Sequence, residues 1–199
     1  AAYVLARYRF RGSKLINVMF MGGLFINVNY IVVPIFLMFV DADKFLKGLG
    51  GDGFFLNNLF IVALVYASTA LPFTIYLLSG FFVTIPKDYE EAAYVDGSGY
   101  FRTMVKIMMP MALPSIITVI LFNFLSFWNE YIISMTLLTK QDLKTLPVGL
   151  MNLMAAQKSA VQYGQLYAGL VIVMLPTLIL YMCVQKKLTQ GMTMGGLKG

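Results

Sequence analysis

Long hydrophobic runs without a charged side chain dominate the pattern along this chain. There are four such runs, and each contains the roughly 20 residues that an α-helix needs to cross the hydrocarbon core of a bilayer. The backbone in these runs has to be helical, because an open sheet edge in lipid leaves its polar groups without hydrogen bonds. The pattern predicts an all-α polytopic membrane protein. The expected spanning helices cover about 15–40, 56–83, 111–138 and 166–184.

The composition agrees with this prediction and excludes several classes of protein. Of the 199 residues, 59% are hydrophobic and 12% are charged, which is about half the charge of a soluble domain. This balance argues against a soluble enzyme, a nucleic-acid-binding protein and a disordered chain. The chain has no His and one Cys, so it offers no imidazole base, no His-containing zinc site and no intrachain disulfide. We therefore expect no catalytic residue and no metal site.

The Lys and Arg residues between the predicted spans are unevenly distributed. If residues 1–14, 84–110 and 185–199 lie in the cytoplasm, that side carries ten Lys and Arg and the opposite side five. The positive-inside rule favours this topology, which explains the net charge of +6 without a nucleic-acid partner. Residues 1–7 resemble the last turns of a helix that begins upstream. We expect one transmembrane domain over 1–199, truncated at its amino end.

The predicted cytoplasmic loop 84–110 has the pattern of a short exposed helix followed by a second helix. Pro86 suits the first helical position, acidic residues follow in the first turn, and Gly97 suits the end of the helix. The second helix runs from about Tyr100 to Pro110 and leads into the next span. A helix that projects between two spans is suited to contact a partner in the cytoplasm.

This loop reads Glu91-Ala92-Ala93, three residues, Gly97, nine residues, and then Ile107-Met108-Met109-Pro110. It resembles the EAA loop of ABC-importer permeases, E-A-A-x3-G-x9-I-x-L-P, and departs from it only in Met109, which preserves volume and apolarity. In that family the loop is a coupling helix that sits in a cleft of a separate ATPase. The docking residues that the resemblance implies are Glu91, Ala92, Ala93, Asp96, Gly97, Ile107 and Pro110.

Three further motifs extend the resemblance along the chain. Residues 127–131 read F-W-N-E-Y, residues 145–150 read T-L-P-V-G-L, and residues 191–199 read G-M-T-M-G-G-L-K-G. They resemble the W-N-E-Y/F signature, an outer loop and the closing tail of the sugar-importing branch, which is related to the maltose permease subunits. In that branch the tail of one permease subunit reaches between the ATPases. The tail residues implied to contact the ATPase are Thr193, Gly195 and Lys198.

Polar side chains within the third predicted span need a reason, because polar groups are costly in lipid. At 100° per residue, four of them fall within an arc of about 80°. Such a stripe is either the wall of a substrate path or a set of interhelical hydrogen bonds without substrate contact. Glu130 alternatively reaches the outer membrane interface. The candidate path residues, with two aromatic neighbours, are Asn123, Ser126, Phe127, Glu130, Tyr131 and Ser134.

The source of energy lies outside this chain. No G-x-x-x-x-G-K-[ST] sequence occurs, so the chain has no P-loop to hold ATP phosphates. The resemblance implies a type I ABC-importer transmembrane domain, with four spanning helices and a cytoplasmic coupling helix, in a bacterial or archaeal cytoplasmic membrane. The implied partners are a pair of cytoplasmic ATPases that bind ATP and Mg, a second related permease subunit, an extracytoplasmic substrate-binding protein and membrane lipid.

The implied substrate is a sugar or an oligosaccharide, carried by a subunit without catalytic residues or a cofactor of its own. The EAA loop by itself fits permeases for amino acids, peptides or phosphate equally well. An ion-coupled secondary transporter is a weaker alternative, because it needs ionisable groups within the membrane and only Glu130 qualifies.

Overall fold

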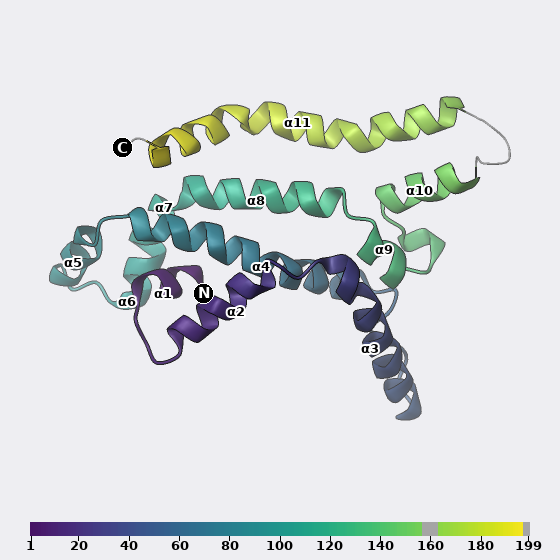
Figure 1. The fold of residues 1–199 in the computed structure, drawn as a ribbon, viewed down its shortest axis with the longest axis horizontal. Coiled ribbons are helices and arrows are strands. Elements are labelled where there is room, and N and C mark those ends of the chain that lie inside the picture. Colours follow the sequence, from purple (N-terminus) through teal and green to yellow (C-terminus); the bar gives the residue numbers. More distant parts are fainter. Residues whose placement is uncertain (157–162, 197–199) are drawn as a thin grey trace. The chain divides into compact units, whose positions relative to one another are not determined.

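The computed structural model describes residues 1–156 and 163–196, and within these ranges the chain forms helices and turns without a strand (Figure 1). The chain divides into two compact units where the sequence predicts one domain. Of the described residues, unit 1 contains 1–25, 70–123 and 185–196, and unit 2 contains 26–69, 124–156 and 163–184. The sequence gives no sign of this division, because the apolar helices α4 (Leu59–Thr84), α8 (Leu113–Trp128) and α11 (Tyr163–Gly196) run without interruption across its boundaries.

Unit 1 combines short helices with parts of the long ones. Its core contains Tyr3, Phe82 and Met108, which are buried together. A Cβ atom at Gly23 would lie 2.8 Å from the Cγ of Pro72, so the glycine lets its helix approach α4 closely. The short elements of unit 1 are α1 (Ala2–Arg7), α2 (Ser13–Gly23), α5 (Asp88–Val95), α6 (Tyr100–Thr103), the π-helical η1 (Met104–Met108) and α7 (Met109–Met111).

Unit 2 has its own apolar core. Val32, Val62 and Val65 are buried there with Ile133 and Leu137, so residues distant in the sequence form one cluster. With parts of α4, α8 and α11, the elements of this unit are α3 (Val28–Gly48), α9 (Ile132–Leu137), the 3-10 helix η2 (Gln141–Leu143) and α10 (Leu146–Ala156).

Two described helices are long and apolar enough to cross a membrane. They are α4, with 26 residues, and residues 163–183 of α11, with 21 residues. They coincide with the predicted spans 56–83 and 166–184. The number rises to four if each of two interrupted helix pairs counts as one span.

The first predicted span differs from the structure, which has two helices where the sequence predicts one over 15–40. The first of them, α2, ends at Gly22 and Gly23, which are weak helix formers. The second, α3, begins at Val28, where the side chain of Asn27 accepts a hydrogen bond of 2.9 Å from the backbone N–H of Asn29. A side-chain cap of this kind starts a new helix instead of continuing an old one.

The third predicted span, 111–138, is also interrupted. Helix α8 ends at Trp128, and α9 begins at Ile132. Between them, the carboxylate of Glu130 accepts hydrogen bonds from the backbone N–H groups of Ile133, at 2.7 Å, and Ser134, at 3.3 Å. This carboxylate satisfies N–H groups that a continuous helix would pair with its own carbonyls. Glu130 therefore lies in the break and Ser134 in α9, and the two do not share one continuous helix with Asn123 and Ser126.

Candidate functional site

Helix α5 lies within the loop predicted to couple the chain to an ATPase, and its end depends on Gly97. This residue has φ +75°, a left-handed conformation that glycine adopts without the steric cost of a Cβ atom. The N–H of Ser98 donates to the carbonyl of Ala93 at 2.8 Å, and the N–H of Gly97 donates to the carbonyl of Tyr94 at 3.0 Å. This pair of bonds is the Schellman arrangement that closes a helix. The glycine of the motif is thus required by the turn itself.

The predicted docking residues of α5 differ in their exposure. Glu91, Ala92, Asp96 and Gly97 are exposed, whereas Ala93 is buried within the chain. Of the two predicted residues further along, Ile107 lies half-buried in η1 and Pro110 is exposed. Of the predicted docking residues at α5, only Glu91, Ala92, Asp96 and Gly97 are therefore accessible to a partner.

Sequence reasoning missed one prominent exposed residue of α5. Val95 is 87% exposed and lies one helical turn after Glu91, on the same side of α5. The signal that would have indicated it is a large aliphatic residue four positions after Glu91, on a short helix that has no other large aliphatic residue.

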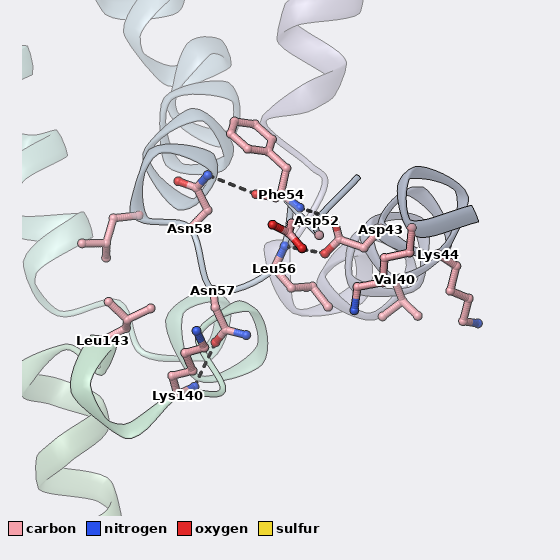
Figure 2. Close-up of a pocket in the computed structure, with 13 residues that line it drawn as sticks. Val40, Asp43, Lys44, Asp52, Phe54, Leu56, Asn57, Asn58, Lys140 and Leu143 are labelled. Carbon is pink, nitrogen blue, oxygen red and sulfur yellow. Dashed lines mark hydrogen bonds between the residues drawn. The ribbon is translucent and has the colours of Figure 1, made fainter. Parts of the chain in front are cut away.

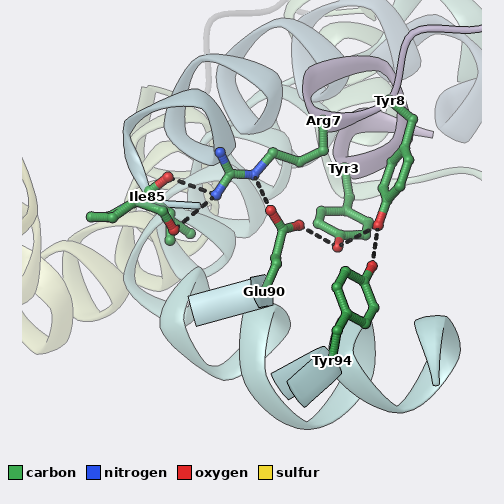
Figure 3. Close-up of polar contacts among 7 residues, drawn as sticks. Tyr3, Arg7, Tyr8, Ile85, Glu90 and Tyr94 are labelled. Atoms are coloured by element: carbon green, nitrogen blue, oxygen red, sulfur yellow. Dashed lines mark hydrogen bonds and ion pairs between the residues drawn. The ribbon is translucent and has the colours of Figure 1, made fainter. Parts of the chain in front are cut away.

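A buried ion pair holds α5 against α1 (Figure 3). The Nε of Arg7 lies 3.2 Å from Oε2 of Glu90, and the two side chains are only 5% and 10% exposed. The Nη2 of Arg7 also donates to the carbonyl of Ile85 at 2.6 Å, and the hydroxyl of Tyr3 donates to Oε1 of Glu90 at 2.5 Å. The adjacent acids Glu90 and Glu91 thus differ in position: Glu90 is buried against α1, and Glu91 faces outward.

A pair of tyrosines extends this network. The hydroxyls of Tyr8 and Tyr94 are 2.8 Å apart and form a hydrogen bond (Figure 3). The hydrogen bond with Tyr8, together with burial and nearby negative charge, raises the pKa of Tyr94 to about 12. The phenol therefore stays neutral at physiological pH. No sequence pattern pairs residues 3–8 with residues 90–94, so sequence reasoning missed this network.

Unit 2 contains a pocket of about 280 Å³ beside the break between α8 and α9. Four of the predicted path residues line it, namely Ser126, Phe127, Glu130 and Tyr131. The pocket residues that sequence reasoning missed include Asn29, Tyr66, Thr69 and Asn129.

The other two predicted path residues form interhelical hydrogen bonds instead. Asn123 donates to Oγ1 of Thr74 at 3.0 Å. Ser134 is fully buried, and its hydroxyl lies 2.5 Å from that of Tyr66. Hydrogen bonds of this kind connect helices inside a membrane.

Tyr66 of α4 organises the pocket. Its hydroxyl donates to Oε2 of Glu130 at 2.6 Å, and its ring stacks on Phe127 with centroids 5.1 Å apart and planes 7° apart. Glu130 therefore accepts bonds from Tyr66 and from the first turn of α9, so its carboxylate is held in place. The pocket combines aromatic faces, amides and a fixed carboxylate, which suits a polyhydroxylated ligand.

Trp128 contributes to packing within unit 2. Its Nε1 donates to the carbonyl of Val173 in α11 at 2.9 Å, and its ring stacks on Phe124. The tail lies further along α11. Thr193 and Gly195 fall within this helix, and Lys198 lies outside the described residues.

A second, larger pocket of unit 2, about 690 Å³, lies at the end of α3 (Figure 2). The buried carboxylate of Asp43 accepts bonds of 2.7, 2.8 and 3.0 Å from the backbone N–H groups of Phe54, Phe55 and Leu56. Burial by itself raises the pKa of Asp43, but these three donors and the charge of Lys47 outweigh it, and the net shift is downward.

Residues 1–194 match the protein family described as "Binding-protein-dependent transport system inner membrane component". The chain belongs to this family. Together with the two long apolar helices, this membership makes it a membrane protein and a permease-type transport component. The resemblance stated from the EAA loop is confirmed.

Curated relatives of the chain are similar along almost all of it. It is 35% identical over 194 residues to the diacetylchitobiose uptake system permease protein NgcG of Streptomyces coelicolor, covering 98% of the chain and 61% of the relative. It is 29% identical to the trehalose/maltose transport system permease protein MalG of Thermococcus litoralis, covering all of the chain and 67% of that protein. The chain thus spans about three fifths of the length of NgcG.

A solved structure supports the fold. A chain from a bacterial ABC transporter involved in the import of the acidic polysaccharide alginate is 27% identical, with a TM-score of 0.68 over 93% of this chain and 65% of that one. The expected all-α fold of a type I ABC-importer transmembrane domain is confirmed. The number of membrane passes stays a prediction.

Proposed function

We propose that the chain is the membrane-spanning permease part of an ATP-driven importer that moves a sugar or an oligosaccharide across the cytoplasmic membrane. The observation that carries this proposal is helix α5. Its exposed side presents the motif residues Glu91, Ala92 and Gly97, while its buried side is fixed by the ion pair of Glu90 with Arg7. Because α5 is held in this way, a displacement of α5 by a partner is passed on to α1.

The chain itself carries out no catalysis in this proposal. ATP and Mg bind to a pair of separate cytoplasmic ATPases, whose closure moves α5 and switches the permease between inward-facing and outward-facing states. Their docking site comprises the exposed motif residues and Val95, with Thr193, Gly195 and Lys198 of the tail as a second contact. A second permease subunit completes the path, and an extracytoplasmic binding protein delivers the substrate.

The pocket beside Glu130 is the proposed point of contact with substrate. Its volume lies at the low end of the range for small-molecule sites, so it fits only a part of an oligosaccharide. Two observations support a sugar as the ligand: the aromatic and polar lining of the pocket, and the relatives, whose names state diacetylchitobiose and trehalose or maltose as their cargo.

The test is uptake by the full-length protein, assembled with its ATPases and second permease in vesicles that contain ATP. We expect labelled di- and oligosaccharides to accumulate with the cognate binding protein, and unlabelled amino acids, peptides and phosphate not to compete. The Tyr131→Ala variant, which alters the pocket wall, should weaken uptake several-fold. The matched control is Asn123→Ala, since Asn123 lies outside the lining and should leave the half-saturating sugar concentration unchanged.

Two results would contradict the proposal. If an amino acid or phosphate inhibits uptake and no sugar does, the substrate is not a sugar. Equal effects of Tyr131→Ala and Asn123→Ala on the half-saturating concentration would remove the pocket from the substrate path.

A further inference from the structure

A third pocket, in unit 1, is not used by the proposed transport mechanism. It has a volume of about 610 Å³ and lies where the chain passes from α1 into α2, with Lys87 of the neighbouring loop at its rim. Four cationic side chains line it, and none of the described residues that line it is acidic. The cationic residues are Arg7, Arg9, Lys14 and Lys87.

Three of these four charges have no counter-ion among the residues that the structure describes. Arg7 is neutralised by Glu90, whereas Arg9, Lys14 and Lys87 form no ion pair with any described residue. The adjoining α2 has no acidic residue in its first turn and no side-chain cap, so the positive end of its dipole adds to the same potential. The pocket thus has the charge pattern of an anion site.

The surface that continues from this pocket is apolar. Leu15, Val18 and Met19 of α2 are each more than 60% exposed, and Phe10 lies in the pocket wall. A ligand that satisfies both parts carries a negative headgroup and a hydrocarbon chain. A free phosphate ion satisfies only the first part.

We propose that this pocket binds the headgroup of an anionic phospholipid, with the phosphate near Arg9, Lys14 and Lys87 and the acyl chains along α2. The site rests on the membrane location of the chain and on no step of import. Its failure and the failure of the transport proposal are therefore separate results.

The test compares lipid binding by the purified full-length protein in micelles, with a fluorescent phosphatidylglycerol and a fluorescent phosphatidylcholine as probes. The first variant replaces Arg9, Lys14 and Lys87 by Gln. A basic residue near an anionic membrane surface contributes about 1 kcal/mol, or roughly fivefold in affinity, so the triple variant should lose at least tenfold for phosphatidylglycerol and little for phosphatidylcholine. A charge-preserving variant, Arg9→Lys with Lys14→Arg and Lys87→Arg, should retain the preference.

A matched control exists in unit 2. The pocket at the end of α3 is of similar size and also has three lysines, Lys44, Lys47 and Lys140, but it contains the acids Asp43 and Asp52 as well. Replacing these three lysines by Gln should leave phosphatidylglycerol binding unchanged.

Three outcomes would overturn the proposal. They are equal binding of the two lipids by the wild-type protein, an equal loss in the control variant, and displacement of phosphatidylglycerol by millimolar inorganic phosphate. The last result would identify free phosphate as the ligand.

Discussion

Each unit contains a buried carboxylate, Glu90 in unit 1 and Asp43 in unit 2, and the two charges are stabilised in different ways. In unit 1, Glu90 is neutralised by side chains, because it pairs with Arg7 and accepts a bond from Tyr3. In unit 2, the charge of Asp43 is stabilised by the backbone, because its carboxylate accepts three hydrogen bonds from the N–H groups of residues 54–56. The first arrangement joins helices more than 80 residues apart in sequence, and the second shapes a loop close to its own helix.

The comparison indicates which of the two carboxylates contributes more to the free energy of unfolding. Removing the side chain of Glu90 leaves the guanidinium of Arg7 buried without an opposite charge. Removing the charge of Asp43 leaves only neutral N–H groups, which can donate to water or to an amide oxygen instead. Charged partners inside a protein are much more expensive to leave unpaired than neutral ones. Loss of a carboxylate that pairs with a charged side chain should therefore lower the free energy of unfolding more than loss of one that is bound by backbone N–H groups. The following variants test this ranking.

The largest effect is expected for Glu90→Ala. This change leaves the guanidinium of Arg7 buried without its partner, which typically costs about 3–5 kcal/mol. The free energy of unfolding of the purified protein, measured by denaturant titration in mixed micelles, gives the loss. The control is Glu91→Ala at the adjacent exposed position, which should change stability by about 0.5 kcal/mol or less. Equal losses in the two variants would refute the buried ion pair.

An intermediate effect is expected for Tyr66→Phe. Glu130 combines the two arrangements, since it accepts from the Tyr66 hydroxyl and from the backbone of α9. The variant loses the hydrogen bond to this carboxylate, which should lower the free energy of unfolding by about 1.5–3 kcal/mol, and it also loses the contact with the Ser134 hydroxyl. Tyr76→Phe, on the same helix and half exposed, is the control and should be close to neutral. A neutral Tyr66→Phe would mean that the backbone bonds alone hold Glu130.

A smaller effect, dependent on pH, is expected for Asp43→Asn. The pKa of Asp43 is lowered in the folded state, so its contribution is fully present above the unfolded pKa of about 3.9 and disappears as the pH falls through the folded pKa. At pH 7 the variant should lose about 1–2 kcal/mol, and the difference from wild type should shrink below about pH 4. The control Asp41→Asn, at an exposed ion pair, should cost less than about 1 kcal/mol. If the difference in unfolding free energy between Asp43→Asn and wild type grows as the pH falls, the pKa of Asp43 is not lowered in the folded state.

The smallest effect is expected for Gly97→Ala, which changes only the backbone. Nothing lies within 4 Å of an added Cβ, so the cost is that of the left-handed conformation, about 1 kcal/mol. Gly99→Ala is the control, since Gly99 has φ −72° and equally open surroundings. Equal unfolding free energies for the two variants would show that the end of α5 does not need a glycine.

Sequence patterns that extend over one or two helical turns predicted most of the helices but few of the contacts between them. The hydrophobic runs predicted the long helices, and the acidic first turn and Gly97 predicted α5, because these features act over one or two helical turns. The breaks within the first and third predicted spans were missed, since Asn27 and Glu130 interrupt their helices through side-chain hydrogen bonds that hydropathy does not record.

The candidate site shows the same limit. Ser126, Phe127, Glu130 and Tyr131 lie near one another in sequence and also line one pocket. Tyr66, which organises that pocket, comes from a different helix, and nothing in its local sequence distinguishes it from the other aromatic residues. The partner of Glu90 was equally hidden, because Arg7 reads as an ordinary basic residue at the end of a helix.

The central claim is that the exposed side of α5 docks on a cytoplasmic ATPase. The most direct test is to purify the full-length protein from native membranes, as wild type and as Glu91→Lys, and to measure the ATPase that co-purifies. We predict that an ATPase accompanies the wild-type protein and is depleted in the variant, with equal amounts of permease in the membrane. If the wild-type protein inserts normally and no ATPase accompanies it, the claim is contradicted, and α5 is an ordinary connection between two helices.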